Sequence, residues 1–350
     1  MNDTANNNGK DIVFVVDDSM SSLMTARHAL EGDFRVYTFQ SAEKMLEMLL
    51  IFKPSLIILD LEMYEISGYD VLTVLKGEPD YATLPVIIVT AKTDIVSEIR
   101  CMRLGASDYL TKPFIPMRLK NQVHTRIQMN HLSEEIARLK YAEYSRVTQF
   151  FEGLTYGAAA SLGDSFFDEA VRVRGLITEL VAHLQTLSAY QQELKEWNPV
   201  FAGASSMVRD IGKSAMDEII EKKTPLAEDE HSVIRKHPVI GVAMLNKLLA
   251  ERKDDEDLAR AAVFAGSHHE NWDGTGYPKR LQNLGIPLEG RILSPVDSYV
   301  ALTSPRPYRD ALTDVNAKKI IISEMGKKFD PDITRHFIAI LNGEPTDIIL

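Results

Sequence analysis

Residues 12–18 read Ile-Val-Phe-Val-Val-Asp-Asp, a continuous apolar run that ends in two carboxylates. Two further apolar runs, residues 56–59 and 86–89, are separated by longer amphipathic segments such as 41–50. Short continuous apolar runs are typical of strands that are buried on both faces of a parallel sheet, with helices on either side. The N-terminal third therefore predicts an alternating α/β fold.

Polar side chains follow these predicted strands, at the edge where open parallel sheets bind their ligands. In chain order they are Asp17, Asp18, Asp60, Thr90 and Lys112. Three carboxylates that converge on one point need a hard cation between them, so we predict a Mg²⁺ site at Asp17, Asp18 and Asp60. With Lys112 neutralising phosphoryl oxygens, Asp60 is a candidate nucleophile and Thr90 a candidate donor to the new phosphate. A helix cap explains any single aspartate more simply, but not the ordered set.

The segment 11–125 resembles the receiver domain of two-component response regulators. The matching residues are the acidic pair Asp17 and Asp18, the phosphoacceptor Asp60, and the switch residues Thr90, Tyr109 and Lys112. The resemblance implies a flavodoxin-like fold of five strands and phosphotransfer from a sensor histidine kinase. It also implies a cis Lys112-Pro113 bond. Tyr64 stands where that family often has Pro, and we expect phosphorylation to survive this change.

The composition limits what the whole chain can be. Its 350 residues predict two domains, or three, and 45% hydrophobic with 25% charged residues is average for globular proteins. A formal charge of −11 gives no global attraction to nucleic acid or to an anionic membrane. No apolar run approaches the ~20 residues that span a bilayer. Residues 1–10 predict a disordered tail without a signal-peptide pattern, and the single Cys101 fits a reducing compartment, so we expect a cytoplasmic protein.

Residues 118–160 predict a long linker helix. Its partial apolar repeat, with charged residues between, consists of Leu132, Ile136, Leu139, Val147 and Phe150. Such a repeat favours pairing with the same helix of a second subunit, although Glu143 and Arg146 interrupt it. A helix packed on its own domains is the alternative. In the favoured homodimer, phosphorylation of Asp60 biases the output domain through helix packing.

Residues 161–341 lack period-two strands and are rich in amphipathic patterns, so we predict an all-α domain. Its histidines and aspartates form groups that only tertiary packing can bring together. The groups are Arg209-Asp210-Ile211-Gly212-Lys213, His237-Pro238, His268-His269-Glu270 and Asp297. Taken alone, adjacent histidines on a helix point about 100° apart and are more often a surface pair than a metal site.

Together these groups resemble the HD-GYP subgroup of the HD metal-dependent phosphohydrolases, whose members hydrolyse cyclic di-GMP. The motifs Asp-Ile-Gly-Lys (210–213), Arg-Lys-His-Pro (235–238), His-His-Glu-Asn-Trp-Asp-Gly-Thr-Gly-Tyr-Pro (268–278) and Leu-Thr-Ser-Pro-Arg-Pro-Tyr-Arg (302–309) stand in family order. The resemblance implies metal ligands at Asp210, His237, His268, His269 and Asp297, with Asp210 and Lys213 as catalytic residues. It also implies ligand contacts from Tyr277, Arg306 and Arg309.

Three residues depart from that family. Arg209 replaces the His of the His-Asp dyad, and arginine has no lone pair for a metal. Glu169 stands where another ligating His is expected and can still offer an oxygen, while Val300 replaces a second Asp. The remaining ligands suit one Fe, Mn, Ni or Zn ion and are few for two. The permanent charge of Arg209 beside Asp210 also competes with a second cation.

Two functions remain open. The first is a response regulator whose degenerate HD-GYP domain has weak or no hydrolase activity and regulates cyclic di-GMP signalling by binding. Its target is a partner protein, such as another cyclic di-GMP enzyme, or the dinucleotide. The alternative is an active metal-dependent cyclic di-GMP phosphodiesterase that Asp60 phosphorylation switches. Arg209 favours the first, because two ions normally steady the entering and leaving oxygens. A DNA-binding output is not favoured, since no basic recognition helix is present.

Overall fold

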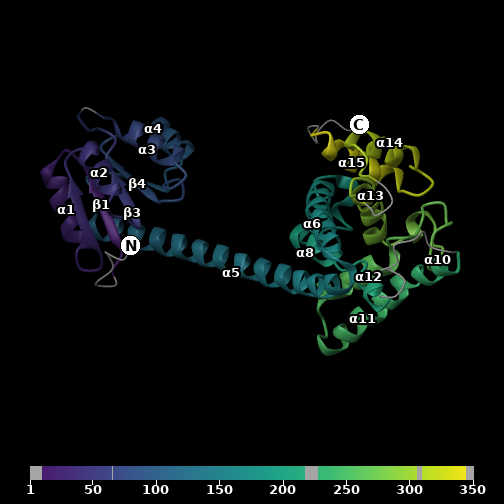
Figure 1. Cartoon of the computed structure of the whole chain (residues 1–350). Helices are drawn as coiled ribbons and strands as arrows, with labels where there is room; N and C mark the ends of the chain where they lie inside the picture. The colour runs from purple at the N-terminus through teal and green to yellow at the C-terminus, as the bar shows by residue number, and fades with distance from the viewer. Residues whose placement is uncertain (1–9, 65, 217–227, 306–309, 344–350) are drawn as a thin grey trace. The chain divides into compact units, whose positions relative to one another are not determined.

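The computed structural model describes residues 10–64, 66–216, 228–305 and 310–343. The chain folds into two compact units, Met1–Lys140 and Tyr141–Leu350. Each unit has its own hydrophobic cores. Figure 1 labels the helices and strands along the chain. Among the described residues, no helix combines the length and the apolar character that crossing a bilayer requires.

The first unit is built on a parallel sheet of five strands in the order β2-β1-β3-β4-β5. The strands are β1 (Ile12–Val16), β2 (Arg35–Phe39), β3 (Leu56–Leu59), β4 (Val86–Thr90) and β5 (Asp108–Thr111). The predicted α/β fold of five strands is confirmed. Strand β2 lies at the edge of the sheet and is only partly buried, so its sequence holds no continuous apolar run.

Helices cover both faces of this sheet (Figure 1). They are α1 (Met20–Leu30), α2 (Ala42–Leu49), α3 (Gly68–Gly77), α4 (Ile95–Arg103) and the start of α5 (Pro116–Leu162). Helices α1 and α5 share one core with the sheet, and α2, α3 and α4 share the other. The helices α1 to α4 each begin after a Ser or Asp whose side chain accepts a backbone N–H of the first turn.

Helix α5 belongs to both units. Its first turns bury Leu119 and Val123 in the core of the first unit, and its later turns bury Phe151 and Ala158 in the second. Between them, residues 131–143 are exposed to solvent. The predicted long linker helix is therefore present, and it is one continuous element of 47 residues.

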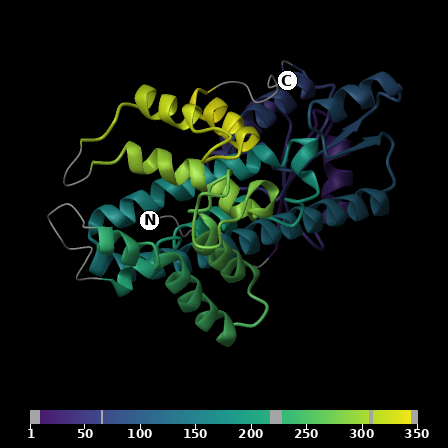
Figure 2. The same cartoon turned by 90° about the vertical axis from the view of Figure 1, so that its right-hand side faces the viewer.

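The second unit is helical, as the sequence predicts. Its helices are α6 (Asp164–Leu184), α7 (Ser188–Gln191), α8 (Pro199–Ser206), α10 (Glu228–Ile234), α11 (His237–Glu251), α12 (Glu256–Ser267), α13 (Leu288–Leu302), α14 (Asp314–Ser323) and α15 (Pro331–Leu341), with the 3₁₀ turns η1 (Ile211–Ala215) and η2 (Asn283–Gly285). Helices α6, α13 and α15 share one core, and α8, α11 and α12 contribute to a second. Figure 2 shows α13, α14 and α15, yellow-green to yellow, as one group.

Candidate functional site

An acidic site lies at the carboxyl edge of the parallel sheet. Asp17 follows β1 and Asp60 follows β3, and both side chains are buried, whereas Asp18 is exposed. One oxygen of each of the three carboxylates lies within 4.8 Å of the others. Three oxygen donors at this distance fit a hard divalent cation such as Mg²⁺.

Lys112 is the cation that faces these carboxylates. Its Nζ lies 2.5 Å from Asp17 Oδ2 and 2.7 Å from Asp60 Oδ2. Burial raises the pKa of Asp17, and the hydrogen bond from Lys112 opposes that rise. The peptide bond between Lys112 and Pro113 is cis. The lysine thus stands where it can bind an oxygen of a phosphoryl group on Asp60.

The two other switch residues lie beside this edge. Thr90 ends β4 and is fully buried. The Tyr109 hydroxyl, on β5, donates a hydrogen bond of 2.7 Å to the backbone oxygen of Lys92. Tyr64, the departure from the family pattern, is 85% exposed and contributes nothing to the buried site. The fold therefore gathers all the residues predicted for the phosphorylation site at one edge of the sheet.

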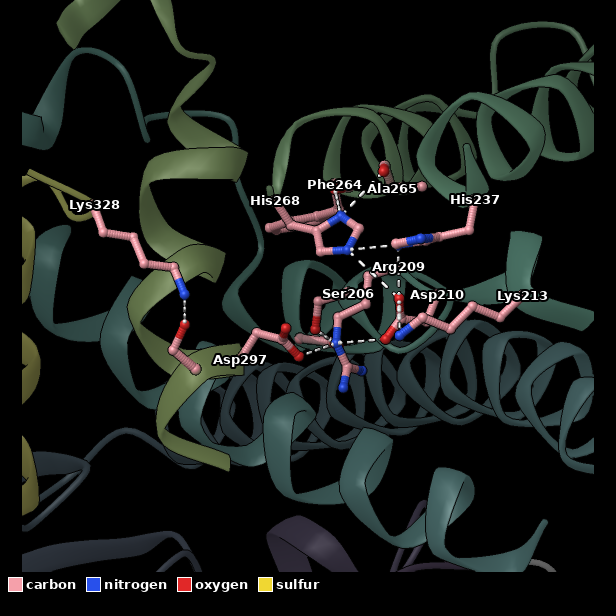
Figure 3. A network of polar contacts seen from close by, with 12 residues as sticks. Ser206, Arg209, Asp210, Lys213, His237, Phe264, Ala265, His268, Asp297 and Lys328 are labelled. Atoms are coloured by element: carbon pink, nitrogen blue, oxygen red, sulfur yellow. Dashed lines mark hydrogen bonds and ion pairs between the residues drawn. The ribbon is translucent and has the colours of Figure 1, made fainter. Parts of the chain in front are cut away.

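A second site forms in the helical unit, from residues far apart in the sequence. Asp210 precedes η1, His237 begins α11, and His268 and His269 follow the last turn of α12. Ligand atoms of these four side chains all lie within 4.8 Å of one another. Figure 3 shows Asp210, His237 and His268 converging from their separate elements. Gly212 permits this approach, because a Cβ there would collide with the backbone oxygen of His237.

The proton positions of two histidines follow from their backbone contacts. His237 Nδ1 lies 2.7 Å from the carbonyl oxygen of Ile234, and His268 Nδ1 lies 3.0 Å from that of Ala265. A carbonyl oxygen only accepts, so each Nδ1 carries a proton, and in the neutral ring each Nε2 presents a lone pair. The two Nε2 atoms are 3.3 Å apart. Backbone carbonyls orient metal-binding histidines in the same way.

Asp210 adds a buried carboxylate to these lone pairs. Its Oδ1 lies 3.0 Å from His237 Nε2 and 3.5 Å from His268 Nε2, and Lys213 Nζ lies 2.8 Å away. No aligned hydrogen bond among the described residues satisfies this oxygen. Burial disfavours the charged form, but the positive charge of Lys213 leads the causes that hold the pKa of Asp210 well below its usual value. An anionic oxygen and two lone pairs aimed at one point fit a metal ion.

His269 completes the group. Burial and the neighbouring His268 hold its pKa well below the usual value, so the ring is neutral and able to ligate. Tyr277 stacks on this ring with centroids 4.7 Å apart and planes 22° apart. Gly276 lets the Tyr277 loop lie close, since a Cβ there would collide with the backbone of residues 269–271. Tyr277 therefore lies against the candidate metal-ligand cluster, which consists of Asp210, His237, His268 and His269.

Glu270 is a residue whose contribution the sequence did not reveal. Its side chain is buried and accepts backbone N–H bonds from Lys279 at 2.7 Å and Leu281 at 2.9 Å. Both carboxylate oxygens thus hold the loop that carries Tyr277, rather than pointing at the cluster. In the sequence, Glu270 directly follows the candidate ligands His268 and His269. Only the folded structure shows that its carboxylate binds the backbone of the Tyr277 loop.

Arg209 lies beside the cluster and is 1% exposed. Its Nε is 2.6 Å from Asp297 Oδ1 and 4.0 Å from Asp210 Oδ2, so its main partner is Asp297 and not its sequence neighbour (Figure 3). Burial opposes the charge of Arg209, but Asp297, Asp210 and Glu169 outweigh it and raise the pKa. Burial likewise works against the charged form of Asp297, and Arg209 holds that pKa below its usual value.

The remaining predicted residues divide into three cases. Asp297 and Glu169 lie beside Arg209, outside the group of four whose ligand atoms lie together, and their assignment as metal ligands stays a prediction. Val300 is fully buried in the apolar core. Arg306 and Arg309 lie outside the described residues.

A cavity of about 410 Å³ adjoins this cluster. His268, His269 and Asp297 line one part of it, and Lys328 and Phe329 line another. This volume is within the range of small-molecule sites. Lys328 and the neighbouring Ser298 carry no motif that sequence reasoning could have found.

Comparison with known proteins identifies both units. Residues 13–124 match the response regulator receiver domain, and residues 159–333 match the HD domain. A "Probable cyclic di-GMP phosphodiesterase" of Vibrio cholerae is 30% identical over 93% of this chain and 77% of the relative. The "Cyclic di-GMP phosphodiesterase response regulator RpfG" of Xanthomonas campestris pv. campestris is 28% identical over 95% of this chain and 87% of the relative.

Among solved structures, the beryllofluoride-activated receiver domain of DrrB is 28% identical, with a TM-score of 0.32. The match covers 34% of this chain and 98% of that one. The family matches lie in the two units that carry the acidic site at Asp60 and the cluster of Asp210 with three histidines. The chain therefore belongs to the response regulators that join an N-terminal receiver domain to an HD domain.

Proposed function

We propose that this response regulator controls cyclic di-GMP signalling by binding, through an HD domain that holds one transition-metal ion and has weak or no hydrolase activity. Its target is the dinucleotide or a partner protein, such as another enzyme of cyclic di-GMP metabolism. The input is a phosphoryl group that Asp60 takes from a sensor histidine kinase, with Mg²⁺ at Asp17, Asp18 and Asp60.

The ion pair between Arg209 and Asp297 carries this proposal. A buried guanidinium, 2.6 Å from the carboxylate, already neutralises the side of the site where a second ion would need that oxygen. Arginine keeps its charge and offers no lone pair. Asp210 and the three histidines that remain form a donor set for a single Fe, Mn, Ni or Zn ion.

The chemistry of such a site is limited. A single ion bound by Asp210, His237, His268 and His269 would polarise a phosphodiester oxygen. Lys213 is 2.8 Å from Asp210 and can bind a phosphate oxygen nearby. Arg209 cannot generate a hydroxide nucleophile, so the site lacks part of what a two-ion displacement needs. We expect hydrolysis to be slower by orders of magnitude than in a two-ion site.

An active cyclic di-GMP phosphodiesterase is the second candidate. Two observations support it: the four-residue cluster and Lys213 are in place, and both relatives are named for that activity. Glu169 is buried beside Arg209 and can offer a further oxygen. One ion with a good electrophilic pocket can cleave phosphodiesters slowly.

Turnover of cyclic di-GMP by the full chain, loaded with Mn²⁺ or Fe²⁺ and with metal counted in the same sample, separates the candidates. We expect about one ion per chain and little turnover. Arg209→His supplies the missing lone pair, so it is expected to raise both metal content and turnover. Two ions per wild-type chain, with turnover that His268→Ala abolishes, would establish the second candidate.

The input is tested separately. Acetyl phosphate with Mg²⁺ is expected to add one phosphoryl group to the wild type and none to Asp60→Asn, as read by intact mass. Asp70→Asn is the matched control, because Asp70 is exposed on α3 and outside the acidic site. Unchanged labelling of Asp60→Asn would remove Asp60 from the proposal.

The proposal includes a homodimer formed through α5. Residues 131–143 of this helix are exposed, and they include part of the apolar repeat. Phosphorylation would then reach the HD domain by changing how two copies of α5 pack.

A further inference from the structure

Lys328 is a partly buried cation that forms no ion pair with the carboxylates of the described residues. Its Nζ donates a hydrogen bond of 2.9 Å to Ser298 Oγ. Burial lowers the pKa of Lys328, and the more distant Asp297 and Glu324 only oppose that fall. The Phe329 ring lies 5.2 Å from this Nζ and partly compensates its charge. An ammonium has three N–H donors, so beyond the bond to Ser298 it can still donate to another acceptor. Withdrawing such a charge from water without pairing it is unfavourable, and a bound anion would compensate that cost.

The fold fixes where this ammonium lies. The backbone N–H of Lys328 donates to the carbonyl of Glu324, and its own carbonyl accepts the N–H of Trp272. The second bond ties Lys328 to the loop that carries Tyr277. Lys327, the preceding residue, is exposed and does not line the cavity. The packing around the metal-ligand cluster therefore fixes the position of Lys328. It does not bring Lys327 to the cavity.

Lys328 and Ser298 line the cavity of about 410 Å³ that also reaches His268 and His269. An anion that Lys328 holds in this cavity therefore lies in the same space as the cluster. Other parts of the wall are apolar and come from Leu302, Ile321 and Phe329. A cavity with a cationic end and an apolar wall suits a ligand with one phosphate and one flat ring.

We infer that Lys328 and Ser298 form a phosphate-binding subsite, which holds one phosphate of a nucleotide ligand while the histidine cluster faces another part of the same molecule. The inference rests on the proposed function, because that proposal supplies the nucleotide. Glu324 lines the same cavity and can accept the N2 amino group of a guanine ring. Lys328 is thus a binding residue that the family motifs do not include.

Calorimetric titration of the Mn²⁺-loaded full chain tests the subsite, with inorganic phosphate and cyclic di-GMP as separate probes. Lys328→Met keeps the length of the side chain and removes its charge. We expect it to weaken binding of both probes about ten- to a hundredfold, the usual worth of a charge-assisted hydrogen bond. Ser298→Ala should weaken them by a smaller factor. Lys327→Met, the matched control, should leave both affinities within about twofold of the wild type.

The outcomes separate this subsite from the proposed function. Phosphate binding that Lys328→Met leaves unchanged, or that the wild type lacks, would overturn the subsite. If phosphate binds through Lys328 but cyclic di-GMP does not bind, the subsite stands and the dinucleotide is not its ligand. If Lys328→Met and Lys327→Met weaken binding equally, the effect is general electrostatics and the subsite is again overturned. Equal metal content and equal melting temperature in all variants exclude a folding defect.

Discussion

The guanidinium of Arg209 is buried among carboxylates that would otherwise repel one another. Asp297, Asp210 and Glu169 all act on its charge. Removing one partner of a buried ion pair leaves the other uncompensated and costs about 3–5 kcal/mol. We therefore predict that Arg209→Met lowers the free energy of unfolding by about this amount, as measured by urea denaturation in the presence of a chelator.

Arg335→Met is the matched control for this prediction. Arg335 is exposed on α15 and pairs with Asp332 at 2.9 Å, at the surface. Such pairs contribute about 0–1 kcal/mol. Equal losses in the two variants would mean that the burial of Arg209 has no special energetic weight.

The residues of the cluster could be predicted, but their partners could not. Recognisable sequence motifs contain all four residues of the cluster, and the fold brings them together. They are Asp210, His237, His268 and His269. The sequence placed Arg209 beside Asp210, whereas its closest carboxylate is 88 positions further on. Neighbouring side chains in a turn point in different directions, so only the packing of α13 decides which carboxylate Arg209 meets.

At the scale of elements, a pair of buried histidines joins α6 to α15. His183 Nε2 lies 3.0 Å from His336 Nδ1. Burial lowers the pKa of His336 from its usual 6.5, with His183 and Arg335 adding to the effect and Asp332 opposing it. Between the lowered pKa and 6.5, the unfolded chain binds more protons than the folded one, so stability falls as the pH drops. We predict a lower free energy of unfolding at about pH 5.5 than at about pH 7.5.

His336→Leu is expected to reduce this pH dependence, because it removes the group that would have to be protonated. His28→Leu is the control, since that side chain is 92% exposed. Denaturant titrations of both variants at the two pH values give the comparison. A slope that His336→Leu leaves unchanged would assign the pH dependence to other groups, such as His269.

The exposed part of α5 carries an apolar stripe that a lone helix leaves in water. Met129, Leu132, Ile136 and Leu139 are spaced by three and four residues and are 46% to 62% exposed. This spacing is typical of the seam of a two-stranded coiled coil. In that register, Glu135 of one helix faces Lys140 of a second, which favours a parallel pair of identical chains.

We predict that Ile136→Glu shifts the chain from dimer to monomer, because it puts two carboxylates into the seam. Sedimentation equilibrium measures the change. Ala137→Glu introduces the same charge at the next residue, on the outer side of the pair, and should leave the dimer intact. A wild type that is monomeric at high concentration would refute the seam.

The strands that are easiest to predict from the sequence are those in which every residue is buried. β1, β3 and β4 are buried at every position, so their sequences are continuous apolar runs. Strand β2 is only partly buried and offers no such run. The loop held by Glu270 and the cavity beside Lys328 depend on contacts between residues far apart in the chain, for which no local pattern exists.

At the scale of the whole molecule, α5 is the described element that both compact units share. A signal that passes along α5 from Asp60 to the HD domain depends on the rotation of one end of the helix relative to the other. Inserting Gly-Gly after Lys140 turns the helix by about 200° and weakens it. We predict that beryllofluoride changes the cyclic di-GMP affinity of the wild type and has no effect on that of the insertion variant. In the insertion variant, the Asp60 site should still bind beryllofluoride and the HD domain should still bind cyclic di-GMP.

Duplicating residues 133–139 is the control, because seven residues restore the phase of the helix to within about 20°. This variant should keep the response to beryllofluoride. Calorimetric titration of cyclic di-GMP measures all three proteins. A response that survives the Gly-Gly insertion would mean that the signal bypasses α5.

The pairing of Arg209 with Asp297 has one more consequence. A metal ion binds reversibly and dissociates when its concentration in the cell falls. The guanidinium of Arg209 is a covalent part of the chain and keeps its charge. The Asp297 carboxylate that Arg209 neutralises therefore stays neutralised when iron or manganese is scarce. A metal ion held by Asp210 and the histidines, as proposed above, would instead follow the cellular supply. The output of this response regulator would therefore depend less on the cellular metal concentration than the output of a relative whose site holds two exchangeable ions.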